Sequence, residues 1–211
     1  MRTDVMELLR CPVAHDASPL VTVARRRDGA WLIDATLGCP VCGAEYALRD
    51  GVALLGGDRD GDAPPPNRPV DAMRIAALLG LADPGLRVML CGSLGAAAVG
   101  LESATGARCV VVNGATAADD ARVDQLVIAA RGLIPLASAS LDGLAVDAHS
   151  ISLLSDGPRV VRQGGRIIAP VNTPVPDRCR ELARDQYEWV AEVQSAATAP
   201  VSIQLSASRK R

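Results

Sequence analysis

The alternation of apolar and polar positions predicts helices and strands that take turns along the C-terminal two thirds of the chain. Apolar residues at helical spacing predict a helix over 70–81, and a run of small residues predicts another over 96–105. Short apolar runs predict buried strands at 87–91, 108–113, 125–129, 144–146 and 166–169. Strands that alternate with helices are typical of an α/β fold with a doubly wound, Rossmann-like parallel sheet.

The segment 159–170, with the sequence RVVRQGGRIIAP, contains the clearest switch from one kind of element to the other. The residues before Gly164 predict the end of an amphipathic helix, and Gly164 and Gly165 supply the left-handed conformation that stops it. The short run after them predicts a buried strand that closes at Pro170. Helix, Gly-Gly and buried strand together form one half of a βαβ unit.

Weaker patterns fill the remaining parts of this region. They predict a short helix over 117–123, a partly helical segment over 149–161 and a helix over 177–185. The segments 188–193 and 201–207 alternate well enough to form an antiparallel pair that closes the sheet.

The first 55 residues predict a small β-rich domain. Strands at 20–24 and 31–36 flank a hairpin tip at 25–29, where Asp28-Gly29 suits a tight turn. A second hairpin is expected from 44–48 and 52–55. The following stretch, GGDRDGDAPPPNR, has no hydrophobic period and reads as a stiff linker. We therefore expect a small domain at 1–55, a linker at 56–68 and a doubly wound domain at 69–211.

The composition favours a soluble globular protein and disfavours several function classes. The chain has 211 residues and a net charge of −2, which provides no general electrostatic attraction to nucleic acid. It has no apolar run long enough to cross a membrane, and its first residues lack the apolar core of a signal peptide. Lys210 is the only lysine among many arginines, which indicates a GC-rich genome. We therefore expect a bacterial, cytoplasmic protein for which neither membrane nor nucleic acid is the partner.

Cysteine and histidine residues near the N-terminus have the spacing of a metal site. Cys39 and Cys42 form a Cys-x-x-Cys knuckle, and the glycine that follows lets backbone amides point at the thiolates. Cys11 and His15 lie upstream at the spacing of a zinc ribbon, and imidazole suits zinc as well as thiolate does. Four protein ligands leave no open position, so we expect a structural zinc. The alternative is that the hairpins pack without a metal.

This N-terminal segment resembles the small zinc-ribbon proteins that act as activator subunits of tRNA and protein methyltransferases. The similarity rests on ELLRCP at 7–12, CPVCG at 39–43 and YALRDGV at 46–52. The family usually has a second cysteine shortly after the first, where this chain has Ala14 and His15. The resemblance implies a methyltransferase or another protein as partner, and a homo-oligomer stays open.

The resemblance also implies contact between the two domains of this chain. Activator subunits cover apolar surface on their methyltransferases, and a covalent link gives the two parts a high effective concentration. We expect Val52, Leu54 and Leu55 to pack against the larger domain.

The region 69–211 resembles the class I methyltransferases that use S-adenosylmethionine. RVVRQGGRI at 159–167 is similar to the family's segment before the fifth strand, and IPL at 134–136 with SLDGL at 140–144 is similar to the element around the fourth. The resemblance implies that the cofactor lies at the turn after the first strand and at the end of the second. The matching residues are Gly92, Ser93, Gly95 and Asn113.

The positions after the fourth strand line the active site in this fold. Asp147 and His149 stand there, and either can serve as a general base. The alternative is that Asp147 caps the next helix and that His149 is a polar surface residue.

The family's acidic cofactor ligands are missing at the matching positions. Leu90 or Cys91 stands where the first strand should end in an acid, and Asn113 replaces the acid that binds the ribose hydroxyls. The acid expected after the third strand falls at Ala130 or Arg131. An amide can accept a hydrogen bond but lacks the charge of a carboxylate.

Three interpretations of function follow. The favoured one is a pseudoenzyme, a binding or scaffold module that no longer holds S-adenosylmethionine well. The alternative is an active methyltransferase with its activator ribbon fused to it. A third, an RNA-binding accessory factor, rests on Arg25, Arg26 and Arg27 alone, and three charges at a hairpin tip are also typical of a solvated turn.

Overall fold

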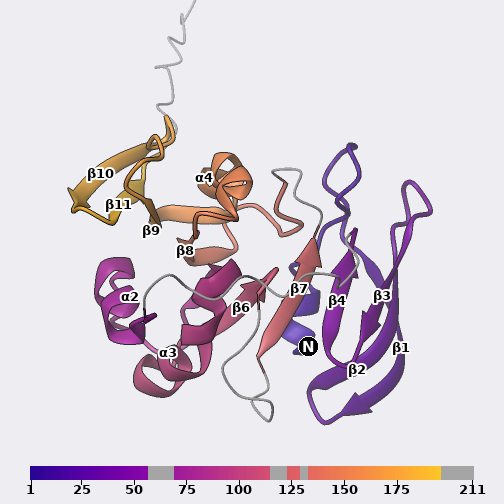
Figure 1. Ribbon diagram of the computed structural model, residues 1–211. Coiled ribbons are helices and arrows are strands. Elements are labelled where there is room, and N and C mark those ends of the chain that lie inside the picture. Colours follow the sequence, from indigo (N-terminus) through magenta and orange to yellow (C-terminus); the bar gives the residue numbers. More distant parts are fainter. Residues whose placement is uncertain (57–68, 115–122, 129–132, 196–211) are drawn as a thin grey trace, which may run out of the picture.

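The computed structural model describes residues 1–56, 69–114, 123–128 and 133–195, and within these residues one continuous sheet contains eleven strands (Figure 1). The strand order is β1-β2-β3-β4-β7-β6-β5-β8-β9-β11-β10. The N-terminal strands therefore extend the sheet of the larger region.

The N-terminal strands form an antiparallel meander. They are β1 (Val21–Asp28), β2 (Trp31–Gly38), β3 (Glu45–Arg49) and β4 (Val52–Leu55). The expected hairpin tip at 25–29 is wrong in part, because β1 continues through the three arginines and turns only at Gly29, whose φ is +58°. The arginines thus lie on a strand: Arg26 and Arg27 pair with Asp34 and Leu32 of β2, and Arg25 falls at a register shift between Ala24 and Arg26.

The larger region contributes seven strands among the described residues; the sheet is parallel from β4 to β9, and β11 and β10 are antiparallel to their neighbours. They are β5 (Arg87–Cys91), β6 (Arg108–Val112), β7 (Asp124–Ile128), β8 (Leu141–Ala145), β9 (Val161–Pro170), β10 (Cys179–Arg184) and β11 (Glu188–Val193). The strand order reverses between β5 and β8, and such a switch point is where open α/β sheets place their ligand crevice. The prediction of a mixed α/β fold is confirmed, and the sheet is parallel from β4 to β9.

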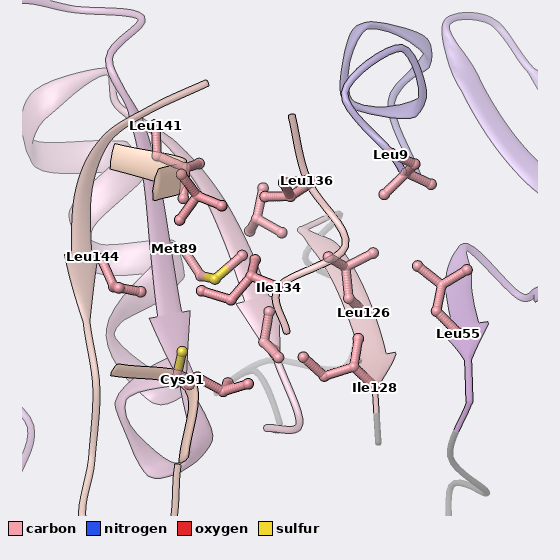
Figure 2. Close-up of a cluster of buried hydrophobic side chains, with 14 of the residues drawn as sticks. Leu9, Leu55, Met89, Cys91, Leu126, Ile128, Ile134, Leu136, Leu141 and Leu144 are labelled. Carbon is pink, nitrogen blue, oxygen red and sulfur yellow. The ribbon is translucent and has the colours of Figure 1, made fainter. Parts of the chain in front are cut away.

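The junction between the two regions is a parallel pair of strands. Val52 to Leu55 of β4 lie beside Gln125 to Ile128 of β7, so the expected contact through Val52, Leu54 and Leu55 is present. Leu9 also forms a bridge to Leu136. Figure 2 shows Leu9 and Leu55 beside Leu126 and Leu136 in one buried cluster. The two regions therefore share a hydrophobic core.

Helices cover both faces of the sheet. They are α1 (Thr3–Met6), α2 (Ala72–Leu79), the 3-10 helix η1 (Gly92–Ala97), α3 (Ala98–Thr105), the 3-10 helix η2 (Ile151–Asp156) and α4 (Gly157–Val160). Alternate residues of β5 point to opposite faces: Val88 belongs to the core cluster that contains residues of α2 and α3, and Met89 to the cluster that contains residues of α1, η2 and α4. Among the described residues, none of the helices has the length and apolar character needed to cross a bilayer.

The helix expected over 177–185 is wrong, because this segment forms the edge strand β10. Cys179 and Leu182 are three residues apart, which is a helix-like spacing. In a strand the same odd spacing places them on opposite faces, and each packs against a different core cluster. The expected partner of 188–193 is also wrong: β11 pairs with β9 and β10, and the segment 201–207 lies outside the described residues.

The Gly-Gly break lies inside a strand. Helix α4 already ends at Val160, and β9 runs from there to Pro170. Between Val161 and Arg166 the register shifts against β8, so the glycines belong to a bulge. Gly164 has a φ of +77°, as the sequence predicted, but it serves the bulge and not a helix end. A Cβ at Gly165 would lie 2.6 Å from the carbonyl oxygen of Asp142.

Other expected elements are present with shifted ends. Helix α2 begins after Asp71, whose carboxylate accepts hydrogen bonds from the backbone N–H of Met73 and Arg74, and it ends at Gly80. The partly helical segment over 149–161 corresponds to η2 and α4. The short helix expected over 117–123 and most of the linker lie outside the described residues.

Candidate functional site

A cavity of about 490 Å³ opens at the carboxyl ends of β5, β8 and β9. It is lined by residues 69–71, 74–75, 93–94, 146–149, 169–172 and 186–188. Both candidate catalytic residues, Asp147 and His149, are in its wall, together with the candidate cofactor residue Ser93. The candidate residues Gly92, Gly95 and Asn113 are not among the lining residues. The cavity wall thus contains only some of the residues that the sequence predicted for the site.

The carboxylate of Asp147 is held by four hydrogen-bond donors. Its Oδ2 accepts from the backbone N–H and the hydroxyl of Ser93, each at 2.9 Å. Its Oδ1 accepts from the backbone N–H of His149 at 3.1 Å and of Ser150 at 3.0 Å. Only 8% of Asp147 is exposed. These contacts tie the end of β8 to the turn after β5, and they start the turn that leads into η2.

Asp147 also fills the space above Gly92. Gly92 has a φ of +60°, and a Cβ on it would overlap the Asp147 carboxylate. A Cβ on Gly114, in the segment that follows β6, would overlap the carbonyl oxygen of Gly92. The chain ends of β5 and β6 are therefore in direct backbone contact. This is the place where the family resemblance puts the cofactor.

The side chain of Asn113 completes the pairing between β6 and β7. Its Oδ1 accepts from the backbone N–H of Ile128 at 2.8 Å, and its Nδ2 donates to the carbonyl of the same residue at 3.1 Å. The residue has a φ of +50°, a conformation that asparagine tolerates better than most side chains. Both polar atoms of the amide are thus used within the sheet.

His149 is the most accessible polar residue of the candidate set. Its side chain is 56% exposed, and its Nδ1 lies 3.7 Å from Oδ2 of Asp147. Gly95, by contrast, is buried within η1, and Leu94 points partly into the cavity. The turn 92–95 is a 3-10 helix and not an open loop. Leu90 and Cys91 are fully buried, and Ala130 and Arg131 lie outside the described residues.

An ion cluster that sequence reasoning missed contributes Arg74 and Glu188 to another wall of the cavity. Arg74 of α2 donates from Nη2 to Asp185 and from Nε to Glu188, each at 2.6 Å. Backbone N–H groups of Glu188 and Tyr187, followed by Arg74, lower the pKa of Asp185 to about 2. More than a hundred residues separate Arg74 from its partners, so no local motif indicates this contact.

The four predicted metal ligands come together on the N-terminal region. Sγ of Cys11, Cys39 and Cys42 and a ring nitrogen of His15 all lie within 4.8 Å of one another. The sulfurs of Cys11 and Cys42 are 3.7 Å apart, and Cys39 Sγ is 3.4 Å from His15 Nε2. A tetrahedral zinc with bonds of about 2.3 Å requires sulfurs about 3.8 Å apart. The donor set and its spacing therefore fit zinc.

Neighbouring groups orient these ligands. Nδ1 of His15 lies 2.6 Å from the carbonyl of Asp16, so a proton on Nδ1 leaves Nε2 free to bind a metal. Burial favours the neutral thiol of Cys39, but backbone N–H groups of Cys42 and Val41 and the neighbouring thiols outweigh it and lower the Cys39 pKa to about 6. A thiolate is the form that binds zinc.

The comparisons with known proteins give structural neighbours only. No protein-family model matches the chain, and no curated protein matches it. A chain of the complex between the Haloferax volcanii Trm112 methyltransferase activator and a methyltransferase matches with 11% identity and a TM-score of 0.44, over 61% of this chain and 95% of that one. The antibiotic-resistance methyltransferase Kmr matches with 16% identity and a TM-score of 0.39, again over 61% and 95%.

Other methyltransferase structures are matched over shorter stretches. The geranyl diphosphate C-methyltransferase from Streptomyces coelicolor A3(2) shares 20% identity at a TM-score of 0.38, over 46% of this chain and 41% of that one. The chain spans less than half the length of this enzyme and of the [4+2]-cyclase SpnF. The molecule is thus a mixed α/β protein with methyltransferases as structural neighbours, and the likeness identifies no substrate.

Proposed function

We propose that this protein is a methyltransferase-like binding or scaffold module that no longer binds S-adenosylmethionine well. The observation that carries the proposal is the closed contact at the ends of β5 and β6, where Asp147 covers Gly92 and Gly114 meets the Gly92 carbonyl. A cofactor in that place requires these groups to separate. The residues present therefore do not fit the cofactor.

Opening the closed contact costs free energy, because hydrogen bonds to Asp147 must break. The carboxylate of Asp147 accepts four hydrogen bonds in a nearly buried position. Hydrogen bonds to charged groups contribute about 1.5–3 kcal/mol each, so a ligand that breaks two of them must recover several kcal/mol. Asn113 offers the cofactor no hydrogen bond in return, because both polar atoms of its amide already bond the backbone of Ile128. Opening the site would therefore weaken cofactor binding by several kcal/mol.

The N-terminal region, 1–55, is proposed to be a zinc ribbon joined by 56–68 to the larger domain, 69–211. Cys11, His15, Cys39 and Cys42 would hold the metal. Four protein ligands leave no position for water, so the metal would supply folding stability and no reaction. The continuous sheet through β4 and β7 supports a ribbon that is a fixed part of the molecule.

A direct binding measurement tests the cofactor proposal. We expect a thermal shift below about 2 °C with about 1 mM S-adenosylmethionine or S-adenosylhomocysteine, since a millimolar site gives only about 0.4 kcal/mol at that concentration. Isothermal titration calorimetry on the full chain with zinc bound checks the result. Binding in the low micromolar range would overturn the proposal.

The alternative function is an active methyltransferase with its activator ribbon fused to it. The observation that favours it is the position of His149, which is exposed at the wall of the 490 Å³ cavity beside Asp147. An exposed imidazole there is free to accept a proton from a bound substrate. Tight cofactor binding in the calorimetric experiment, with loss of methyl transfer in His149→Ala, would favour this alternative.

A further inference from the structure

Strand β1 forms one edge of the sheet, and its first half has exposed apolar side chains. In the described part of the chain it pairs only with β2, so one row of its backbone N–H and C=O groups has no partner strand. Val21 and Val23 are 57% and 62% exposed. They lie opposite Gly38 and Thr36 of β2, and directly paired residues share one face of a sheet.

A basic groove continues the same face. A hollow of about 530 Å³ is lined by residues 25–26, 34–36 and 47–49. The hydroxyl of Thr36 accepts a hydrogen bond from Arg25 at 3.2 Å, which places the guanidinium on this face beside Val23. Edge strand, exposed valines and groove thus form one surface, which we call the β1 surface.

The charge of the β1 surface is only partly balanced. Arg26 is neutralised by Asp34 at 2.7 Å and by Asp50 at 2.9 Å. Arg25 and Arg49, in contrast, have no carboxylate within ion-pair distance among the residues that the structure describes. Two unbalanced guanidinium groups therefore face the groove, and they favour an anionic partner.

The same charges decide against self-association through this edge. If two copies paired β1 with β1, the arginine-rich segments 25–27 of both copies would meet at one edge, and like charges near one another across a strand pair are destabilising. A bound polynucleotide is also disfavoured, because the groove lining contains no aromatic side chain on which a base could stack. The valines and the free backbone edge instead suit a peptide.

We propose that the β1 surface binds an extended acidic segment of a partner protein by strand addition. The segment pairs its backbone with β1, places apolar or β-branched side chains on Val21 and Val23, and directs carboxylates to Arg25 and Arg49. This inference goes beyond the proposed function, and it depends neither on the cofactor nor on the state of the cavity.

Selection from a library of random decapeptides displayed on phage tests the proposal, with the full chain as bait. The selected peptides are expected to be rich in Asp and Glu that alternate with β-branched residues. Synthetic copies are then titrated by fluorescence anisotropy. The double variant Arg25→Glu with Arg49→Glu is expected to weaken binding at least about tenfold, which is about 1.4 kcal/mol. The matched control, Arg178→Glu at an exposed site outside the groove, is expected to leave binding within about twofold, as surface changes elsewhere usually do.

Two further comparisons separate strand addition from plain charge attraction. Proline in the middle of a selected peptide is expected to abolish binding, because it removes a backbone donor from the ladder. Circular dichroism and thermal melting check that the double variant is folded. The proposal is overturned if the selection returns no acidic peptides, if they bind the double variant as well as wild type, or if proline has no effect. Tighter binding of a single-stranded RNA decamer would replace it with the nucleic-acid interpretation.

Discussion

Asp147 accepts hydrogen bonds from both the backbone N–H and the hydroxyl of Ser93, each at 2.9 Å. This pair joins the end of β8 to the turn after β5, across the switch point of the sheet. In an enzyme of this fold class the same position lines the active site. Here the carboxylate is engaged by four donors of the protein itself. Its first role is therefore to hold the two strand ends together.

The substitution Asp147→Ala is expected to destabilise the protein. It leaves buried donors of Ser93 and Ser150 without their acceptor, which costs about 2–4 kcal/mol. For a chain of this length that corresponds to a fall of roughly 5–15 °C in the melting temperature. His149→Ala is the control, because the exposed imidazole makes few contacts and should change stability by less than about 0.5 kcal/mol. Equal melting temperatures for Asp147→Ala and wild type would contradict a structural role.

Restoring an acid at Asn113 is expected not to restore cofactor binding. In Asn113→Asp the carboxylate cannot donate to the Ile128 carbonyl and instead faces it, which costs about 1–3 kcal/mol. The carboxylate also remains turned toward β7 and not toward the cavity. Calorimetry with S-adenosylmethionine and thermal melting of the variant measure both effects. If Asn113→Asp gained micromolar binding, the closed contact between Gly92 and Gly114 would have to be easily opened.

One zinc ion per chain is expected in purified protein without an affinity tag. Elemental analysis measures it, and Cys39→Ser is expected to lose the ion and to lower the melting temperature, because metal binding and ribbon folding are coupled. Cys179→Ser is the matched control, since Cys179 is half-buried and outside the cluster. Well under one zinc per chain in the wild type would mean that the hairpins pack without a metal.

The ribbon and the larger region are expected to unfold together. Arg2 donates from Nε to Asp124 at 2.5 Å, and the Asp124 side chain is fully buried. Removal of one partner of a buried ion pair costs about 3–5 kcal/mol, so Asp124→Ala should lower the stability of the whole chain in one transition. Glu192→Ala, which breaks the more exposed pair with Arg180, should change the stability little, because an exposed ion pair is screened by solvent. A separate early transition of the N-terminal region in calorimetry would show that the two parts are independent.

The local sequence pattern was enough to predict those elements whose conformation is set by neighbouring residues. The buried strands at 87–91 and 108–112 follow from runs of apolar residues, and the left-handed Gly164 follows from the Gly-Gly pair. The metal cluster was also accessible, because Cys39 and Cys42 are held by one turn, and two upstream ligands complete a known spacing. The strands and the glycine turn are encoded within a few residues, and the metal cluster is encoded by a spacing that can be read along the chain.

The pairing of these elements and the hydrogen bonds between them depend on the tertiary structure alone. The helix predicted around Leu182 became an edge strand, because pairing with β11 and burial on two opposite faces outweigh a weak helical propensity. The roles of Asp147 and Asn113 depend on donors that the folded chain brings to them, some of them more than fifty residues away. The sequence by itself thus determined the kinds of most elements, but not of 177–185, and the ligand chemistry of the Cys and His cluster. Only the fold decided which polar groups are left free to bind anything, because hydrogen bonds between distant segments form only when the chain is packed.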